Sequence, residues 1–109
     1  MAFKDKITFD KTEVSIYDES GKRPVIYNLT YERITSIQFD RGFMRSMLFL
    51  KKPSDRIVVQ VRGIEDPVIL YSAREGEKFQ GYVDGLRKFA RDNRITLHDY
   101  LAHPEEQKK

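Results

Sequence analysis

The hydrophobic pattern of this chain changes its period once, near residue 72, and this change constrains the fold most. Before it, apolar and polar residues alternate, as in Thr12–Asp18 and Arg56–Arg62, which is typical of strands with one buried face. After it, apolar residues recur at helical spacing, at Phe79, Tyr82, Val83, Leu86, Phe89 and Ala90. The sequence therefore predicts a mainly β domain that ends in one amphipathic helix.

Seven short strands are expected before the helix, and turn residues such as Gly21 and Pro24 separate them. Arg41–Gly42 is expected to break the fourth strand, and Lys52–Asp55 to close the fifth. The strands are expected at residues 6–10, 12–18, 25–29, 34–39, 47–51, 56–62 and 67–71.

The expected helix has recognisable end signals. Ser72 followed three residues later by Glu75 is typical of a capping box, so we expect the helix to begin near Ala73 or Arg74. It is expected to end near residues 92–93, where Asn93 is able to adopt the left-handed conformation of a helix C-terminus.

The length of 109 residues fits one domain, which we place at residues 1–97, followed by a polar, flexible tail at residues 98–109. The chain has no cysteine, which excludes disulfides and Cys-ligated metal sites. No apolar run approaches the ~20 residues of a membrane span, and Met1–Lys6 lacks the apolar region of a secretory signal. We therefore expect a cytoplasmic protein.

Three features carry a resemblance to a known family: the strand count, the entry Tyr31–Ile37 into the fourth strand, and the position of the single helix. In these the chain resembles the pleckstrin-homology-like superfold, and more specifically its small bacterial members, over roughly residues 5–94. The resemblance implies a partly open barrel of about seven antiparallel strands capped by the C-terminal helix. It also implies homo-oligomers formed through sheet edges, as bacterial members form them. Lipid-binding members carry spaced basic residues around the first turn, where this chain has only Lys6 and Lys11.

Signals for catalysis are weak. His98 and His103 are five residues apart near the tail, which is not the spacing of two ligands on one helical face. The glycines match no phosphate-binding fingerprint, and no nucleophile stands in a recognisable elbow. We expect a protein that is not an enzyme, with no catalytic residue, metal or cofactor.

The basic excess of the chain lies in residues 41–63, with six Lys and Arg residues against one acid. Cations mixed with Phe and Met suit a protein partner, an anionic lipid surface or single-stranded nucleic acid. Equally, the apolar residues could cap the barrel end while acids elsewhere match the cations. The candidate binding residues are Arg41, Phe43, Met44, Arg45, Met47, Lys51 and Lys52.

Gly81 and Gly85 lie on the polar side of the expected helix, where glycine costs about 0.5–1 kcal/mol relative to alanine. They indicate either neutral drift of the sequence, in a helix that its apolar face anchors, or a helix face that another chain approaches closely. Taken together, these features favour a binding or assembly module, through protein–protein interaction or homo-oligomerisation. The alternative is binding of anionic ligands through residues 41–52.

Overall fold

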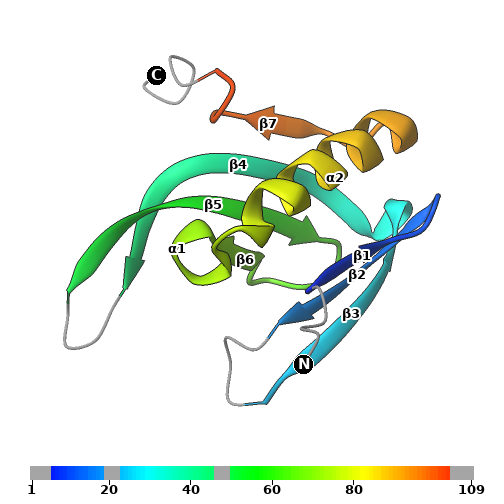
Figure 1. Cartoon of the computed structure of the whole chain (residues 1–109). Helices are drawn as coiled ribbons and strands as arrows, with labels where there is room; N and C mark the ends of the chain where they lie inside the picture. The colour runs from blue at the N-terminus through cyan, green and yellow to red at the C-terminus, as the bar shows by residue number, and fades with distance from the viewer. Residues whose placement is uncertain (1–5, 19–22, 46–49, 104–109) are drawn as a thin grey trace.

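The structure is a computed structural model that describes residues 6–18, 23–45 and 50–103, with only the backbone of Arg45. It confirms a mainly β chain with one main helix (Figure 1). Within the described residues there are seven strands in two sheets, ordered β1-β2-β3 and β6-β5-β4-β7, and the sheets do not join into a closed barrel. The core lies between the sheets and the helix.

The first sheet is an antiparallel meander that follows the alternation of the sequence. It consists of β1 (Ile7–Phe9), β2 (Glu13–Asp18) and β3 (Val25–Thr30). Val14 and Ile16 stand opposite Leu29 and Tyr27, and this face turns toward the core. A single 3-10 turn, η1 (Tyr31–Arg33), then carries the chain into the second sheet.

The second sheet is built on a long hairpin of β4 (Ile34–Arg45) and β5 (Lys51–Val61). β6 (Val68–Tyr71) pairs with one side of it, and β7 (Leu97–Asp99) runs parallel to β4 on the other. The expected break at Arg41–Gly42 is wrong, because β4 continues for three residues beyond Gly42. The expected turn at Lys52–Asp55 is also wrong, because those residues belong to β5.

Pro53 is tolerated inside β5 because its backbone nitrogen, which carries no hydrogen, points away from β4. The N–H of Asp55 donates to Ser72 Oγ at 3.0 Å, so this side of β5 faces away from β4. Pro53 lies two residues earlier, and backbone groups two apart in a strand point the same way. The missing N–H therefore removes no hydrogen bond between β4 and β5.

The helical region is interrupted near its start. α1 (Ser72–Glu75) ends at Gly76, whose φ of 63° stops the helix, and α2 (Lys78–Asn93) follows. The expected capping box is wrong: Tyr71 is the N-cap and makes no side-chain cap bond, while Ser72 Oγ bonds to β5. The predicted apolar stripe of α2 is confirmed, since all six of its residues are buried.

The end of α2 differs from the expectation by one residue. Arg94, not Asn93, takes the left-handed conformation, with a φ of 57°. Asn93 instead donates from Nδ2 to the carbonyls of Phe89 and Lys11, each at 3.0 Å, so it ties the helix end to the first turn. Past the domain boundary expected at residue 97, His98 and Asp99 are part of β7, and the Tyr100 N–H donates to Phe39 O at 2.8 Å.

Candidate functional site

The β4–β5 hairpin extends beyond the strands that flank it. β6 pairs only with Arg56–Val59, and β7 only with Ile37–Phe39. Residues 40–45 and 51–55 therefore form a two-stranded projection, here called the arm, which curves away from the core in Figure 1. Most of the candidate binding residues lie on it.

The candidate residues divide between the two faces of the arm. Arg41 and Phe43 share the face of Phe39, which is the face toward α2, and Met44 and Lys52 oppose each other on the other face. Arg45, the last residue of β4, stands opposite Lys51 in the register. Met47 lies outside the described residues. The candidate residues whose side chains the structure describes thus lie on both faces of the arm and do not form one continuous surface.

Two large apolar side chains are exposed toward the end of the arm: Phe43 on β4, and Leu50, which immediately precedes β5. Phe43 is 61% exposed and Leu50 is 66% exposed, while Met44 is half-buried. Phe43 therefore does not cap the core. Leu50 was not among the candidates, although its place between Phe49 and Lys51 in the sequence marks it as part of the same stretch.

Among the cations of residues 41–63 whose side chains are described, two have acid partners. Arg41 Nη1 lies 3.1 Å from Asp55 Oδ1, and Arg56 forms an ion pair with Asp40. Asp40 stands one residue outside the basic stretch, so a count along the sequence misses it. Lys51 and Lys52 are exposed at the end of the arm. The local positive charge is smaller than the sequence indicates.

The root of the arm is held by a buried fork. Arg56 Nε and Nη2 donate to the two carboxylate oxygens of Asp40, each at 2.8 Å, and Gln38 Nε2 donates to Oδ2 at 2.6 Å. Asp40 is only 1% exposed. The hydrogen bonds from Arg56 to Asp40 raise the pKa of Arg56 against the opposing effect of burial, and the charge of Asp40 adds to this. The guanidinium of Arg56 therefore stays charged.

Gly42 makes room for this fork. A Cβ at Gly42 would lie 2.6 Å from Arg56 Nε and 3.0 Å from its Cζ. Arg56 stands opposite Asp40 in the register, and its side chain lies against Gly42, in space that a larger residue would fill. The glycine that reads as a strand breaker is the residue that lets Arg56 reach Asp40.

A second ion pair joins α2 to β7. Arg87 Nε donates to Asp99 Oδ2 at 2.7 Å, and its guanidinium carbon lies 5.6 Å from the ring centre of Phe39. Burial disfavours the charged form of Asp99, but hydrogen bonds from Arg87 and Ala102 outweigh it and lower the pKa of Asp99. A groove of about 410 Å³ lies between this pair and the arm, lined by Arg41, Asp55, Gln80, Val83, Arg87, Tyr100 and Leu101.

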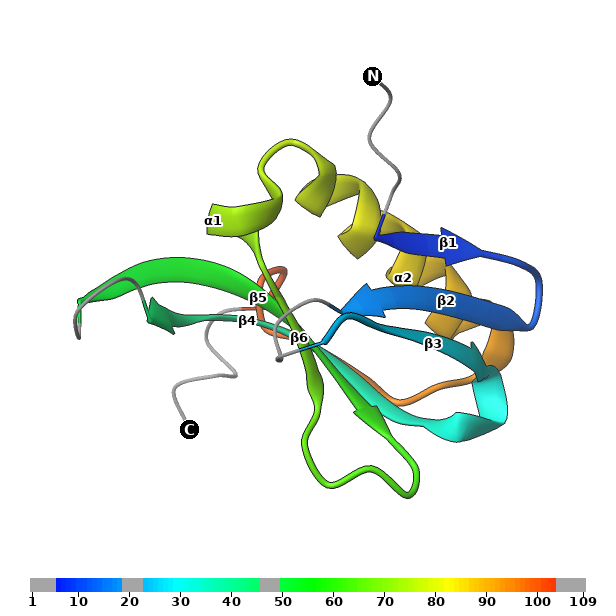
Figure 2. The same cartoon turned by 90° about the horizontal axis from the view of Figure 1, so that it is seen from below.

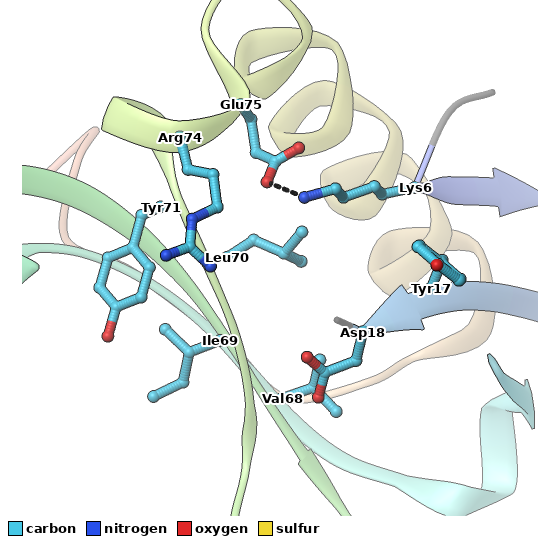
Figure 3. A pocket seen from close by; sticks show the side chains of 9 residues that line it. All are labelled: Lys6, Tyr17, Asp18, Val68, Ile69, Leu70, Tyr71, Arg74 and Glu75. Carbon is cyan, nitrogen blue, oxygen red and sulfur yellow. Dashed lines mark hydrogen bonds and ion pairs between the residues drawn. The ribbon is translucent and has the colours of Figure 1, made fainter. Parts of the chain in front are cut away.

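A small pocket lies between the first sheet and β6, where the two sheets do not join (Figure 3). Its volume is about 20 Å³, enough for roughly one water molecule. Lys6 Nζ pairs with Glu75 Oε2 across it at 2.8 Å, and Glu75 is nearly buried. This pocket is too small for a ligand; the ion pair holds α1 against the first sheet.

The two helix glycines have different surroundings. Nothing lies within 4 Å of a Cβ built at Gly81, whereas a Cβ at Gly85 would collide with the Phe9 ring, 2.6 Å from Cζ. Phe9 also contacts the Phe89 ring, with 6.3 Å between centres. The close approach at Gly85 is therefore made by β1 of the same chain.

Three comparisons with known proteins give no match: no family model fits the sequence, and no curated protein and no solved structure matches the chain. Among the described residues no group of three or more His, Asp or Glu side chains is placed to hold a metal ion. In the same part of the chain no helix has the length and apolar character needed to cross a bilayer.

Proposed function

We propose that this chain is a non-enzymatic protein–protein interaction module that assembles with copies of itself through the arm. The observation that carries the proposal is the exposure of Phe43 and Leu50 on a projection whose root is fixed by the Asp40–Arg56 fork. Large apolar side chains held on a rigid projection lose little conformational entropy when they are buried by a partner. Aromatic side chains such as Phe are also enriched in protein interfaces.

The architecture proposed for this module is the pleckstrin-homology-like one, with the two sheets forming a partly open barrel. The run of antiparallel strands followed by α2 supports it, although six described strands precede the helix instead of the expected seven. Two features depart from the expected pattern: the parallel β7 after the helix, and the arm itself. We place the protein in the cytoplasm on the ground of its cysteine-free composition.

Binding of an anionic lipid surface or single-stranded nucleic acid is the second candidate function. Exposed Lys51 and Lys52 beside exposed Leu50 and Phe43 support it. The ion pairs of Arg41 and Arg56 count against it, because two cations of the stretch already have acid partners. Such binding would weaken steeply as salt is raised, whereas apolar assembly would not.

Light scattering coupled to size exclusion tests the assembly, run at about 50 and 500 mM salt to bracket the screening of surface charge. The wild type is compared with the variant Phe43→Ser/Leu50→Ser and with the matched variant Lys51→Glu/Lys52→Glu. We expect an oligomer in both salts that the serine variant loses and the charge variant keeps. A wild-type monomer in both salts would refute self-assembly, and loss of the oligomer in the charge variant alone would favour an electrostatic contact.

A further inference from the structure

β3 is the last strand of the first sheet, and no described strand lies beside one side of its backbone (Figure 2). Tyr31 N–H donates to Thr12 O at 2.9 Å, next to the register that pairs β3 with β2. Because antiparallel strands alternate the direction of their backbone groups, the N–H and C=O of Ile26, Asn28 and Thr30 point away from β2. No described residue outside β3 hydrogen-bonds to these groups.

This edge lacks the protection that exposed strands normally have. Such edges carry a charge, an internal proline or a bulge that prevents pairing with another chain. The segment Val25–Thr30 has none of these: it is uncharged, and its pairing with β2 is regular over all six residues. Ile26 is 64% exposed and Val25 is 43% exposed. An extended polypeptide added to this edge would pair with its backbone groups and cover its apolar side chains.

A pocket of about 360 Å³ adjoins the start of β3. It lies between Val25 and Tyr27, which share the core-side face of β3 with Leu29, and the turn between β5 and β6. A strand added beside β3 would direct every second side chain to this face. The pocket residues are Asp18, Arg23, Val25, Tyr27, Ile64, Glu65, Asp66 and Pro67.

The charge of this pocket indicates which side chain it accepts. Three carboxylates, of Asp18, Glu65 and Asp66, line it together with one cation, Arg23. Glu65 and Asp66 are exposed in the turn. A side chain with an aliphatic stem and a positive end, Lys or Arg, would pack its stem on Val25 and Ile64 and place its charge near these acids.

We propose that the β3 edge binds an extended segment of another polypeptide, which pairs with Ile26, Asn28 and Thr30 and places a Lys or Arg side chain in this pocket. This site goes beyond the proposed function, because it uses neither the arm nor its residues. Backbone hydrogen bonds supply the affinity, and the acidic pocket supplies the preference for a basic residue.

The test uses two synthetic peptides of alternating threonine and valine, eight residues long, one with a central lysine and one with a central glutamate. Each is titrated into the Phe43→Ser/Leu50→Ser variant, so that assembly through the arm does not interfere, and amide NMR shifts report binding. We expect shifts of residues 25–30 and 64–66, with the lysine peptide binding roughly two- to fivefold more tightly, as for an exposed ion pair.

Two variants separate the backbone from the pocket. Ile26→Pro removes an N–H that β2 does not use and should weaken binding by about five- to tenfold, whereas the matched Ile26→Thr keeps that N–H and should retain binding. Glu65→Lys/Asp66→Lys changes only exposed turn residues and should reverse the preference toward the glutamate peptide. This second variant keeps the test decisive if Ile26→Pro does not fold.

Three results would overturn the proposal. One is the absence of shifts at residues 25–30 with either peptide at millimolar concentration. Another is an unchanged peptide preference in Glu65→Lys/Asp66→Lys. The third is a dimer of the arm variant that Ile26→Pro abolishes, since β3 would then pair with a second copy of itself. A failure of the arm experiment alone would leave these results unaffected, because the two surfaces share no residue.

Discussion

Arg56 lies against Gly42 and donates hydrogen bonds to both oxygens of the buried Asp40 carboxylate, at 2.8 Å each. Removing one partner of a buried pair leaves the other without its counter-charge. We expect Asp40→Asn to lower the free energy of unfolding by about 2–4 kcal/mol, measured by urea denaturation. The matched Asp55→Asn variant removes the half-buried partner of the exposed Arg41 and should cost less than about 1 kcal/mol. Equal losses in the two variants would contradict the role of the fork.

Gly42→Ala tests the same fork without changing any charge. The added methyl would displace the Arg56 guanidinium, so we expect a loss of about 1–3 kcal/mol in the free energy of unfolding. Gly81→Ala is the control, because its methyl meets open space on a helix; it should gain about 0.5–1 kcal/mol. A stabilising Gly42→Ala would show that Arg56 does not need this space.

Gly85→Ala should behave differently from Gly81→Ala although both lie on α2. The new methyl would collide with the Phe9 ring and push it from its contact with Phe89. The gain in helix propensity is then offset, and we expect a net loss of roughly 1 kcal/mol in thermal unfolding experiments. The double variant Gly85→Ala/Phe9→Ala should show much less of this loss for the glycine change. Identical gains for both single variants would refute the Phe9 contact.

The pKa of Asp99, lowered from its ordinary value of 3.8, makes its contribution depend on pH. Because the folded state holds the carboxylate charged, its contribution is fully present above the unfolded value and is lost as the pH falls through the lower folded value. We expect Asp99→Asn to cost about 1–2 kcal/mol between pH 5 and 8, discounted for the partial exposure of Arg87. The difference from wild type should shrink below about pH 4. A difference that is constant down to pH 2.5 would contradict this.

The parts of the fold that local pattern determines were predictable. The alternation in β2 and the helical spacing from Phe79 to Ala90 follow from which face each element buries. The arm was not, because Gly42 and Pro53 act as breakers in isolation. The surroundings of both residues make them compatible with a strand. Arg56 fills the space beside Gly42, and the position where an N–H of Pro53 would lie points away from β4.

The candidate site was predicted only in part for a similar reason. Phe43 and the lysines were identified from composition, and the structure places them on the arm. Asp40 was missed as the partner of Arg56 because a cross-strand register joins residues sixteen positions apart. The β3 edge was missed because exposure of Ile26 depends on which strand ends the sheet, and the sequence does not state strand order.

The central claim, assembly through the arm, is tested most directly by a spin label on it. The chain has no cysteine, so Lys51→Cys provides a single labelling site next to Leu50 on the Phe43 face of the arm, and Lys88→Cys provides a control on α2. The electron paramagnetic resonance spectrum of each label is followed as the protein concentration is raised. The account predicts that the Lys51→Cys label becomes immobilised with rising concentration while the Lys88→Cys label does not. A Lys51→Cys label that stays equally mobile at all concentrations would contradict it.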